Sequence, residues 1–243
     1  MTKPPAEATT ADSAPTWREL AVARSLDSAR TRAENRVQRF LDAAMELMAE
    51  NAGKDFTVQE VVERSGQSLR SFYQYFGGKH ELLLALFEEL VRSSAEQLEA
   101  KVAGIDDPLE KVHVFVIEHY HMARPSLRAK GGSAPKSAVK GAPTTPVMVD
   151  FAQRLLTEHP AEAARAFAPM VALFNRLLDD ATEAGAIRPG LRTGFLTGTM
   201  LEAIMFNAFS ATIAATATDG GPVDPAEELW DLIVHGIGTD RPA

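Results

Sequence analysis

The stretch TVQEVVERSGQSLRSFYQYFGGKHELL, from Thr57 to Leu83, predicts two short helices joined at one glycine. Thr57 stands three residues before Glu60, the capping-box spacing in which each side chain satisfies an amide of the first helical turn. Gly66 follows the apolar stripe of the first helix, where glycine readily takes the left-handed conformation that ends a helix. The stretch is therefore expected to form a helix-turn-helix, with Ser68 as the cap of the second helix.

The second helix is expected to have one apolar and one polar face. Phe72 and Phe76 are one helical turn apart, so both can pack inward. The positions expected to stay exposed are Arg70, Ser71, Gln74 and Tyr75. These residue types suit DNA, because arginine forks onto guanine, glutamine pairs with adenine, and hydroxyls donate to phosphate. Lys79 begins the next helix, where an ammonium and free helix amides together can hold a phosphate.

With these residues, the stretch resembles the DNA-binding domain of the TetR family of transcriptional regulators. The matching positions are Thr57, Val58, Val61, Ser65, Gly66, Ser68, Ser71, Phe72, Tyr73, Tyr75, Phe76, Lys79 and Leu82. Two positions depart from the family pattern: Val62 replaces a small residue, and Gln67 replaces the valine that usually follows the glycine. Val62 is expected to alter only packing, whereas Gln67 places a polar group at the turn.

The resemblance implies two sets of DNA contacts. The residues expected at the phosphate backbone are Thr57, Ser71, Tyr73, Tyr75 and Lys79. Those expected to face the major groove are Gln59, Leu69, Arg70 and Gln74, and Ser68 at the start of the same helix completes the DNA-binding set. The alternative interpretation is a helical hairpin whose aromatic residues serve packing alone.

Composition limits the classes of protein that fit. The 243 residues contain no cysteine, which excludes disulfides and thiolate metal sites, and carry a net charge of −8. Residues 30–85 hold eight basic and eight acidic side chains, whereas the residues after 85 hold 14 basic and 21 acidic. The negative charge thus belongs mostly to the second part, and a DNA-binding surface in the first part fits the composition. Neither a leader nor a membrane span is expected, which favours the cytoplasm.

Apolar periodicity predicts an all-α protein. Besides the two helices of the motif, helices are expected over 34–50, 80–101, 109–123, 146–158, 161–184, 193–217 and 225–236. We expect a flexible N-terminal arm over 1–31, a helix-turn-helix DNA-binding domain over 32–80 and a larger helical ligand-binding and dimerisation domain over 81–243. The arm is either a solvated, weakly helical leader or a DNA contact. Residues 124–146 are rich in Gly, Pro, Ser and Lys and predict a surface loop, with a lid as the alternative.

The second domain is expected to enclose an apolar ligand site. Candidates for its lining are Phe115, His119, Met122, Phe151, Leu155, Met170, Phe174, Leu177, Met200 and Ile204. Each of them has the alternative of being an ordinary core residue. The candidate polar contacts are His119, Asn175 and Asn207. Because methionine adapts its shape, a small apolar or amphipathic effector of acyl, aromatic or steroid-like type is favoured over a charged sugar.

The last two predicted helices carry more apolar side chains than one chain can bury, which predicts a homodimer. The TetR resemblance implies a four-helix dimer interface there, and a two-fold pair of recognition helices matches a palindromic operator. The expected function is that of a repressor released from operator DNA by its effector, with activation as an alternative.

Two other functions are less favoured. An enzyme would need a catalytic or metal arrangement, but His113, His119 and His121 are two positions apart on one helix and so face different directions. No phosphate-binding loop occurs, and neither a metal nor a cofactor is expected. The second alternative is a DNA-binding regulator controlled by a protein partner, for which a closed, fully packed second domain would be the sign.

Overall fold

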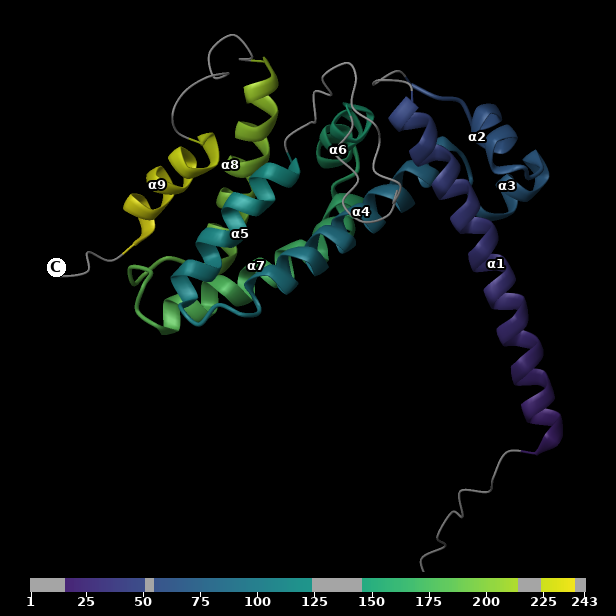
Figure 1. Cartoon of the computed structure of the whole chain (residues 1–243), viewed down its shortest axis with the longest axis horizontal. Helices are drawn as coiled ribbons and strands as arrows, with labels where there is room; N and C mark the ends of the chain where they lie inside the picture. The colour runs from purple at the N-terminus through teal and green to yellow at the C-terminus, as the bar shows by residue number, and fades with distance from the viewer. Residues whose placement is uncertain (1–15, 51–54, 124–145, 214–223, 239–243) are drawn as a thin grey trace, which may run out of the picture.

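The computed structural model describes residues 16–50, 55–123, 146–213 and 224–238 (Figure 1). Within these ranges the regular elements are helices, which confirms the all-α prediction. They are α1 (Trp17–Glu50), α2 (Val58–Ser65), α3 (Leu69–Tyr75), α4 (Lys79–Val102), α5 (Pro108–Ala123), α6 (Pro146–Glu158), α7 (Pro160–Glu183), α8 (Thr193–Ile213) and α9 (Pro225–Ile237). We call α1–α3 the helix-turn-helix unit and α4–α9 the body.

α1 begins at Trp17, so the expected helix start at residue 34 is wrong, and residues 17–31 of the expected arm are helical. The N-terminal half of α1 is mostly exposed, and Figure 1 shows it projecting away from the other helices. Local interactions hold it, including an ion pair of 2.7 Å between Arg30 and Glu34, one turn apart. The apolar stripe begins only at Val37, so periodicity does not indicate the earlier turns. Residues 1–15 of the predicted arm lie outside the described ranges.

An aromatic core holds the helix-turn-helix unit together. Phe72 of α3 is fully buried, with its ring centre 5.4 Å from that of Phe40 on α1 and 5.3 Å from that of Phe76. Val61 of α2 belongs to the same core. Burying one such phenylalanine stabilises the fold by about 1.5–3 kcal/mol. The inner face of α3 is therefore fixed, and its outer face is left open.

α4 connects the helix-turn-helix unit to the other helices of the body and packs along α7 (Figure 1). Phe87 of α4 has its ring centre 5.2 Å from that of Phe167 on α7 and 6.1 Å from that of Phe151 on α6. An ion pair of 2.9 Å between Arg165 and Glu88 spans the same contact. Beyond it, α5, α7 and α8 pack on one another, and α9 packs on α5. α4 thus joins the aromatic core of the first unit to that of the body.

The predicted bounds of the body helices are nearly those observed. α6 begins and ends at the predicted residues, and α4, α5, α7 and α9 differ from prediction by a single residue at one or both ends. Prolines begin α5, α6, α7 and α9, where a fixed φ angle suits the first helical position. The predicted end of α8 at 217 and nearly all of the predicted loop over 124–146 lie outside the described residues. None of the described helices combines the length and the apolar character that crossing a membrane requires.

Candidate nucleic-acid interface

Thr57 and Glu60 form the predicted capping box at the start of α2. The Glu60 amide donates to the Thr57 hydroxyl at 3.2 Å, and the Thr57 amide and hydroxyl donate to the Glu60 carboxylate at 2.7 and 2.8 Å. The Thr57 amide contributes most to holding the pKa of Glu60 below its usual value. Gln59 is exposed on the same helix and donates to Glu63 at 3.0 Å. The Thr57 hydroxyl proton is therefore used within the cap.

The turn between α2 and α3 has the predicted left-handed glycine. Gly66 has φ 65° and ψ 25°, a conformation that glycine adopts without a steric penalty. Gln67 follows it, and its side-chain amide donates to the carbonyl oxygen of Arg36 on α1 at 2.8 Å. The polar group that departs from the family pattern therefore ties the turn to α1. Val62, the other departure, is buried in the core.

α3 presents a guanidinium, a carboxamide and a phenol on its outer side. Its cap is Ser68, whose hydroxyl oxygen accepts from the Ser71 amide at 3.1 Å. The exposed residues that follow are Leu69, Arg70, Tyr73 and Gln74. The Tyr73 ring contacts that of Phe72 edge-on, with the centres 5.4 Å apart. This set can both read base edges and bond to phosphates.

Ser71 and Tyr75 do not stay exposed as predicted. The hydroxyl oxygen of Ser71 is buried and has no hydrogen-bond partner among the described residues. Tyr75 is half-buried against the core. Both residues flank Phe72 on a seven-residue helix, so the contact of α3 with the rest of the unit covers them partly. The exposed face of α3 is therefore narrower than predicted.

Lys79 begins α4 as expected, but its ammonium is directed toward its own chain. It pairs with the carboxylate of Asp55, donates to the carbonyl oxygen of Phe56 and lies 4.6 Å from the centre of the Phe56 ring. The hydrogen bond from Lys79 is the largest cause that lowers the pKa of Asp55. Lys79 therefore fastens the start of α4 to the residues that precede α2, and its charge is only partly available to a phosphate.

The remaining cations of the helix-turn-helix unit divide into paired and unpaired ones. Arg64 of α2 pairs with Glu46 at 3.3 Å and with Glu50 at 2.7 Å, both on α1. Those without an ion pair among the described residues include Arg36, Arg39 and Arg70. Positive charge on α1 and α3 is therefore available for contacts with an anionic partner.

The predicted ligand residues lie in the core of the body. All are buried except Met122, which is partly buried. The rings of Phe115 on α5 and Phe174 on α7 stack with their centres 4.2 Å apart and their planes at 9°. Phe151 lies elsewhere, with its ring beside that of Phe87 on α4. The structure thus brings Phe115, Phe174 and the neighbouring His119 together, whereas the ring contacts of Phe151 are with His80 and Phe87.

His119 is a polar residue of this core with a ring nitrogen that forms no hydrogen bond to the part of the chain that the structure describes. Its Nδ1 is buried without a partner among the described residues, and its ring centre lies 5.7 Å from that of Phe115. Burial lowers the pKa of His119 to about 4, so the ring is neutral near pH 7. Asn175 accepts a hydrogen bond from Thr197, and Asn207 accepts one from Tyr120 at 2.9 Å. Both asparagines are thus already engaged within the protein.

Sequence comparison places this motif in a known family. Residues 40–86 match the profile described as "Bacterial regulatory proteins, tetR family". The HTH-type transcriptional regulator BetI of Brucella anthropi is 27% identical over 78 residues, which are 32% of this chain and 40% of BetI. The fatty acid metabolism regulator protein of Bacillus subtilis is 26% identical over 80 residues, which are 33% of this chain and 41% of that protein. These matches therefore span well under half the length of the curated relatives.

Solved structures show the same fold over most of the chain. A TetR-family transcriptional regulator from Pectobacterium atrosepticum superposes with a TM-score of 0.64 at 18% identity, covering 88% of this chain and 99% of that one. FadR from Bacillus subtilis in complex with stearoyl-CoA gives 0.57 at 16% identity, covering 82% and 98%. At such identities the likeness shows the fold alone. The match over residues 40–86 places the helix-turn-helix segment in the tetR family of bacterial regulatory proteins.

Proposed function

We propose that the chain is a homodimeric repressor that leaves a palindromic operator when a small, largely apolar effector binds. Residues 32–80 bind DNA in this account, and residues 81–243 bind the effector and dimerise. The observation that carries the proposal is the outer face of α3, where Arg70 and Gln74 are exposed while Phe72 fixes the opposite face. A protein of this kind works where bacterial DNA lies, in the cytoplasm.

α3 is the element that enters the major groove. Arg70 and Gln74 bond to base edges, Leu69 contacts a thymine methyl group, and Gln59 approaches from α2. The residues proposed to contact phosphates are Thr57, Ser68, Ser71, Tyr73, Tyr75 and Lys79, of which Ser71 and Tyr75 are partly covered by the protein itself. Of these, Tyr73 has an exposed side chain, whereas Thr57 and Lys79 also serve internal bonds. Replacing Arg70 therefore tests the contacts with bases, and replacing Tyr73 tests the contacts with the phosphate backbone.

Dimerisation through α8 and α9 supplies the second recognition helix. Phe206 of α8 and Leu232 of α9 are each 74% exposed, and Phe195 of α8 is 58% exposed. Large apolar side chains exposed on neighbouring elements mark a protein interface. A two-fold pair through these helices carries two copies of α3, which matches a palindromic operator.

The effector is proposed to bind among α5, α7 and α8, beside Phe115, Phe174 and His119. Nδ1 of His119, which has no hydrogen-bond partner among the described residues, can form a hydrogen bond with a polar group on an otherwise apolar ligand. The FadR structure holds stearoyl-CoA within the same fold, which supports a ligand class with a long apolar chain. α4 follows α3 and runs into the rest of the body. A ligand that binds one arrangement of the body more tightly than another therefore shifts the operator affinity by the same factor as that difference in ligand affinity.

Selection from a library of random duplexes tests the proposal and requires no assumption about the operator sequence. Repeated selection with the full chain is expected to enrich a palindrome whose half-sites are about one helical turn apart, or a multiple of it. Adding long-chain acyl-CoA to the selected complex is then expected to release the DNA. If no sequence is enriched, the DNA-binding function is wrong. If a palindrome is enriched and no apolar ligand among acyl, aromatic and steroid-like compounds releases it, the effector class is wrong.

A further inference from the structure

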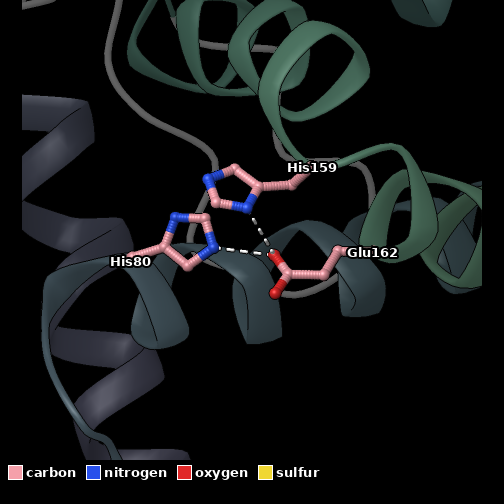
Figure 2. Close-up of side chains that lie close together, drawn as sticks. All are labelled: His80, His159 and Glu162. Atoms are coloured by element: carbon pink, nitrogen blue, oxygen red, sulfur yellow. Dashed lines mark hydrogen bonds and ion pairs between the residues drawn. The ribbon is translucent and has the colours of Figure 1, made fainter.

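Three side chains with metal-binding groups meet where the start of α4 lies against the corner between α6 and α7 (Figure 2). His80 is on the first turn of α4, His159 is the residue that caps α7, and Glu162 is on the first turn of α7. Nε2 of His80 lies 2.7 Å from Oε2 of Glu162, and Nδ1 of His159 lies 4.0 Å from the same oxygen. The ligand atoms of this His–His–Glu cluster all lie within 4.8 Å of one another.

The main chain positions the cluster. The amide of His159 donates to the carbonyl of Leu155 at 3.0 Å, and the carbonyl of His159 accepts from the amide of Ala163 at 3.0 Å, which fixes the corner between α6 and α7. The ring of His80 lies near two other rings, with its centre 4.6 Å from that of His159 and 5.5 Å from that of Phe151. The two imidazoles are therefore held side by side at the contact between the start of α4 and the rest of the body.

The donor set selects the class of ion. Two imidazole nitrogens and a carboxylate oxygen suit Zn²⁺ and the neighbouring divalent transition ions, whereas Mg²⁺ and Ca²⁺ prefer oxygen ligands. Ligand atoms about 2.1 Å from a tetrahedral Zn²⁺ lie about 3.4 Å from each other, a spacing that small rotations of these partly exposed side chains reach. We propose that His80, His159 and Glu162 bind a divalent transition-metal ion, with water at the fourth position.

The charges near the cluster favour a cation. Arg165, one turn further along α7, repels a cation, but its guanidinium pairs with Glu88 at 2.9 Å. The Glu162 carboxylate attracts a dication, which lowers the electrostatic cost of bringing the ion to the site.

His121 shows that a histidine beside a carboxylate does not by itself form such a cluster. His121 has a carboxylate neighbour, Asp224, at 2.8 Å, and the exposed fractions of the two side chains are 45% and 39%. Those of His80 and Glu162 are similar, at 42% and 33%. No third histidine or carboxylate completes a group of metal-binding atoms around His121 among the described residues. The substitution His121→Gln is therefore a matched control for His80→Gln.

Competition with a chromophoric zinc indicator of micromolar affinity tests the site on the full chain in the absence of DNA. We expect one Zn²⁺ per chain and a rise in the melting temperature, because the ion binds the folded state more tightly than the unfolded chain. His80→Gln, His159→Gln and Glu162→Gln should each weaken Zn²⁺ binding by about tenfold or more, since even indirect partners of a metal change its affinity by that factor. His121→Gln should bind Zn²⁺ like the wild type, and millimolar Mg²⁺ should not compete.

Three outcomes overturn the site. One is a wild-type chain that does not compete with the indicator for Zn²⁺. Another is a set of three cluster variants, each with a wild-type circular dichroism spectrum, that bind Zn²⁺ as tightly as the wild type. The third is equal weakening by His121→Gln, which would show that surface histidines bind the ion without a defined site. Retention of Zn²⁺ by Glu162→Gln alone overturns the role of the carboxylate.

A regulatory consequence follows that rests on the proposed function. An ion at the cluster joins the first turn of α4, which follows α3, to the α6–α7 corner and so restricts the angle between them. Zn²⁺ is then expected to change the operator affinity of the wild type severalfold and to leave that of His159→Gln unchanged. An equal effect on both proteins overturns the coupling. Zn²⁺ binding without any operator binding would support the site and contradict the proposed function.

Discussion

The side-chain amide of Gln67, at the turn, donates a hydrogen bond of 2.8 Å to the carbonyl oxygen of Arg36 on α1. This bond fixes the helix start of α3 relative to α1 from a position where the family usually has valine. Replacing Gln67 with Ala should lower the free energy of unfolding by about 1 kcal/mol, the usual net worth of a hydrogen bond. Urea unfolding measures this change. The control Gln59→Ala removes only an exposed bond within α2 and should cost about 0.5 kcal/mol or less; equal losses would mean that the contact with α1 adds nothing.

Arg70 is exposed on α3 and has no ion pair among the described residues, so its guanidinium is available to a guanine edge. Arg70→Ala should cost about 1–3 kcal/mol of binding at one base position and relax the preference there. Fluorescence anisotropy with single-base variants of the operator measures this directly. Tyr73→Phe is the comparison, because losing a phosphate bond should weaken binding to all of the sequences alike. A uniform loss for Arg70→Ala would place it at the backbone.

The ion pair between Lys79 and Asp55 contributes to the dependence of the stability of the fold on pH in acid. The folded-state pKa of Asp55 is lowered, chiefly by Lys79, so its stabilising effect is present above the unfolded pKa and is lost as the pH falls through the folded pKa. Lys79→Met removes the pair, and its melting temperature should fall less steeply than that of the wild type below about pH 4. Lys101→Met at the other end of α4 is the control. Parallel curves for Lys79→Met and the wild type would show that the pair carries no stability.

His119 makes the fold sensitive to mild acid. Its folded pKa of about 4 lies below its unfolded value, so the unfolded chain binds more protons and stability falls as the pH drops from about 6.5 toward 4. Between pH 7 and pH 5, His119→Leu should remove about 2 kcal/mol of this loss, because pH 5 lies about 1.5 units below the unfolded pKa. Thermal unfolding at pH 7 and pH 5 gives the comparison. The same variant should bind the acyl effector more weakly; unchanged effector affinity would exclude a bond to Nδ1.

Leu232 is 74% exposed on α9, and we expect the partner chain to cover it. Leu232→Glu should convert the dimer to a monomer at micromolar concentration, which sedimentation velocity detects. Leu156 of α6 is 48% exposed but lies outside the proposed interface, so Leu156→Glu should remain dimeric. Dissociation of both variants, or of neither, would place the interface elsewhere.

Much of the fold follows from local signals in the sequence. Prolines at helix starts, the Thr57–Glu60 capping box and the left-handed Gly66 set helix ends that the structure reproduces. Such signals act between residues a few positions apart and are therefore visible in one sequence. The early start of α1 at Trp17 is not visible in this way, because a solvent-exposed helix needs no apolar stripe.

Interactions between distant residues are not predictable from such local signals. Gln67 finds its acceptor 31 residues away, and His80 lies beside Glu162, 82 residues further along the chain. The sequence predicts a phosphate anchor at Lys79, but a neighbour that helical periodicity does not reveal, Asp55, takes part of its charge. The packing that brings these pairs together is set by several helices at once.

The most direct test of the central claim is a mobility shift with the promoter region beside the protein's own gene. Because phosphate contacts bind any sequence, the assay needs excess scrambled DNA and near-physiological salt. We expect a retarded complex that persists in the presence of the scrambled DNA and is absent for the double variant Arg70→Ala with Tyr73→Ala. Formation of this complex should require the dimeric protein. Retardation that scrambled DNA abolishes, or that the double variant retains in full, would contradict recognition of the operator by α3.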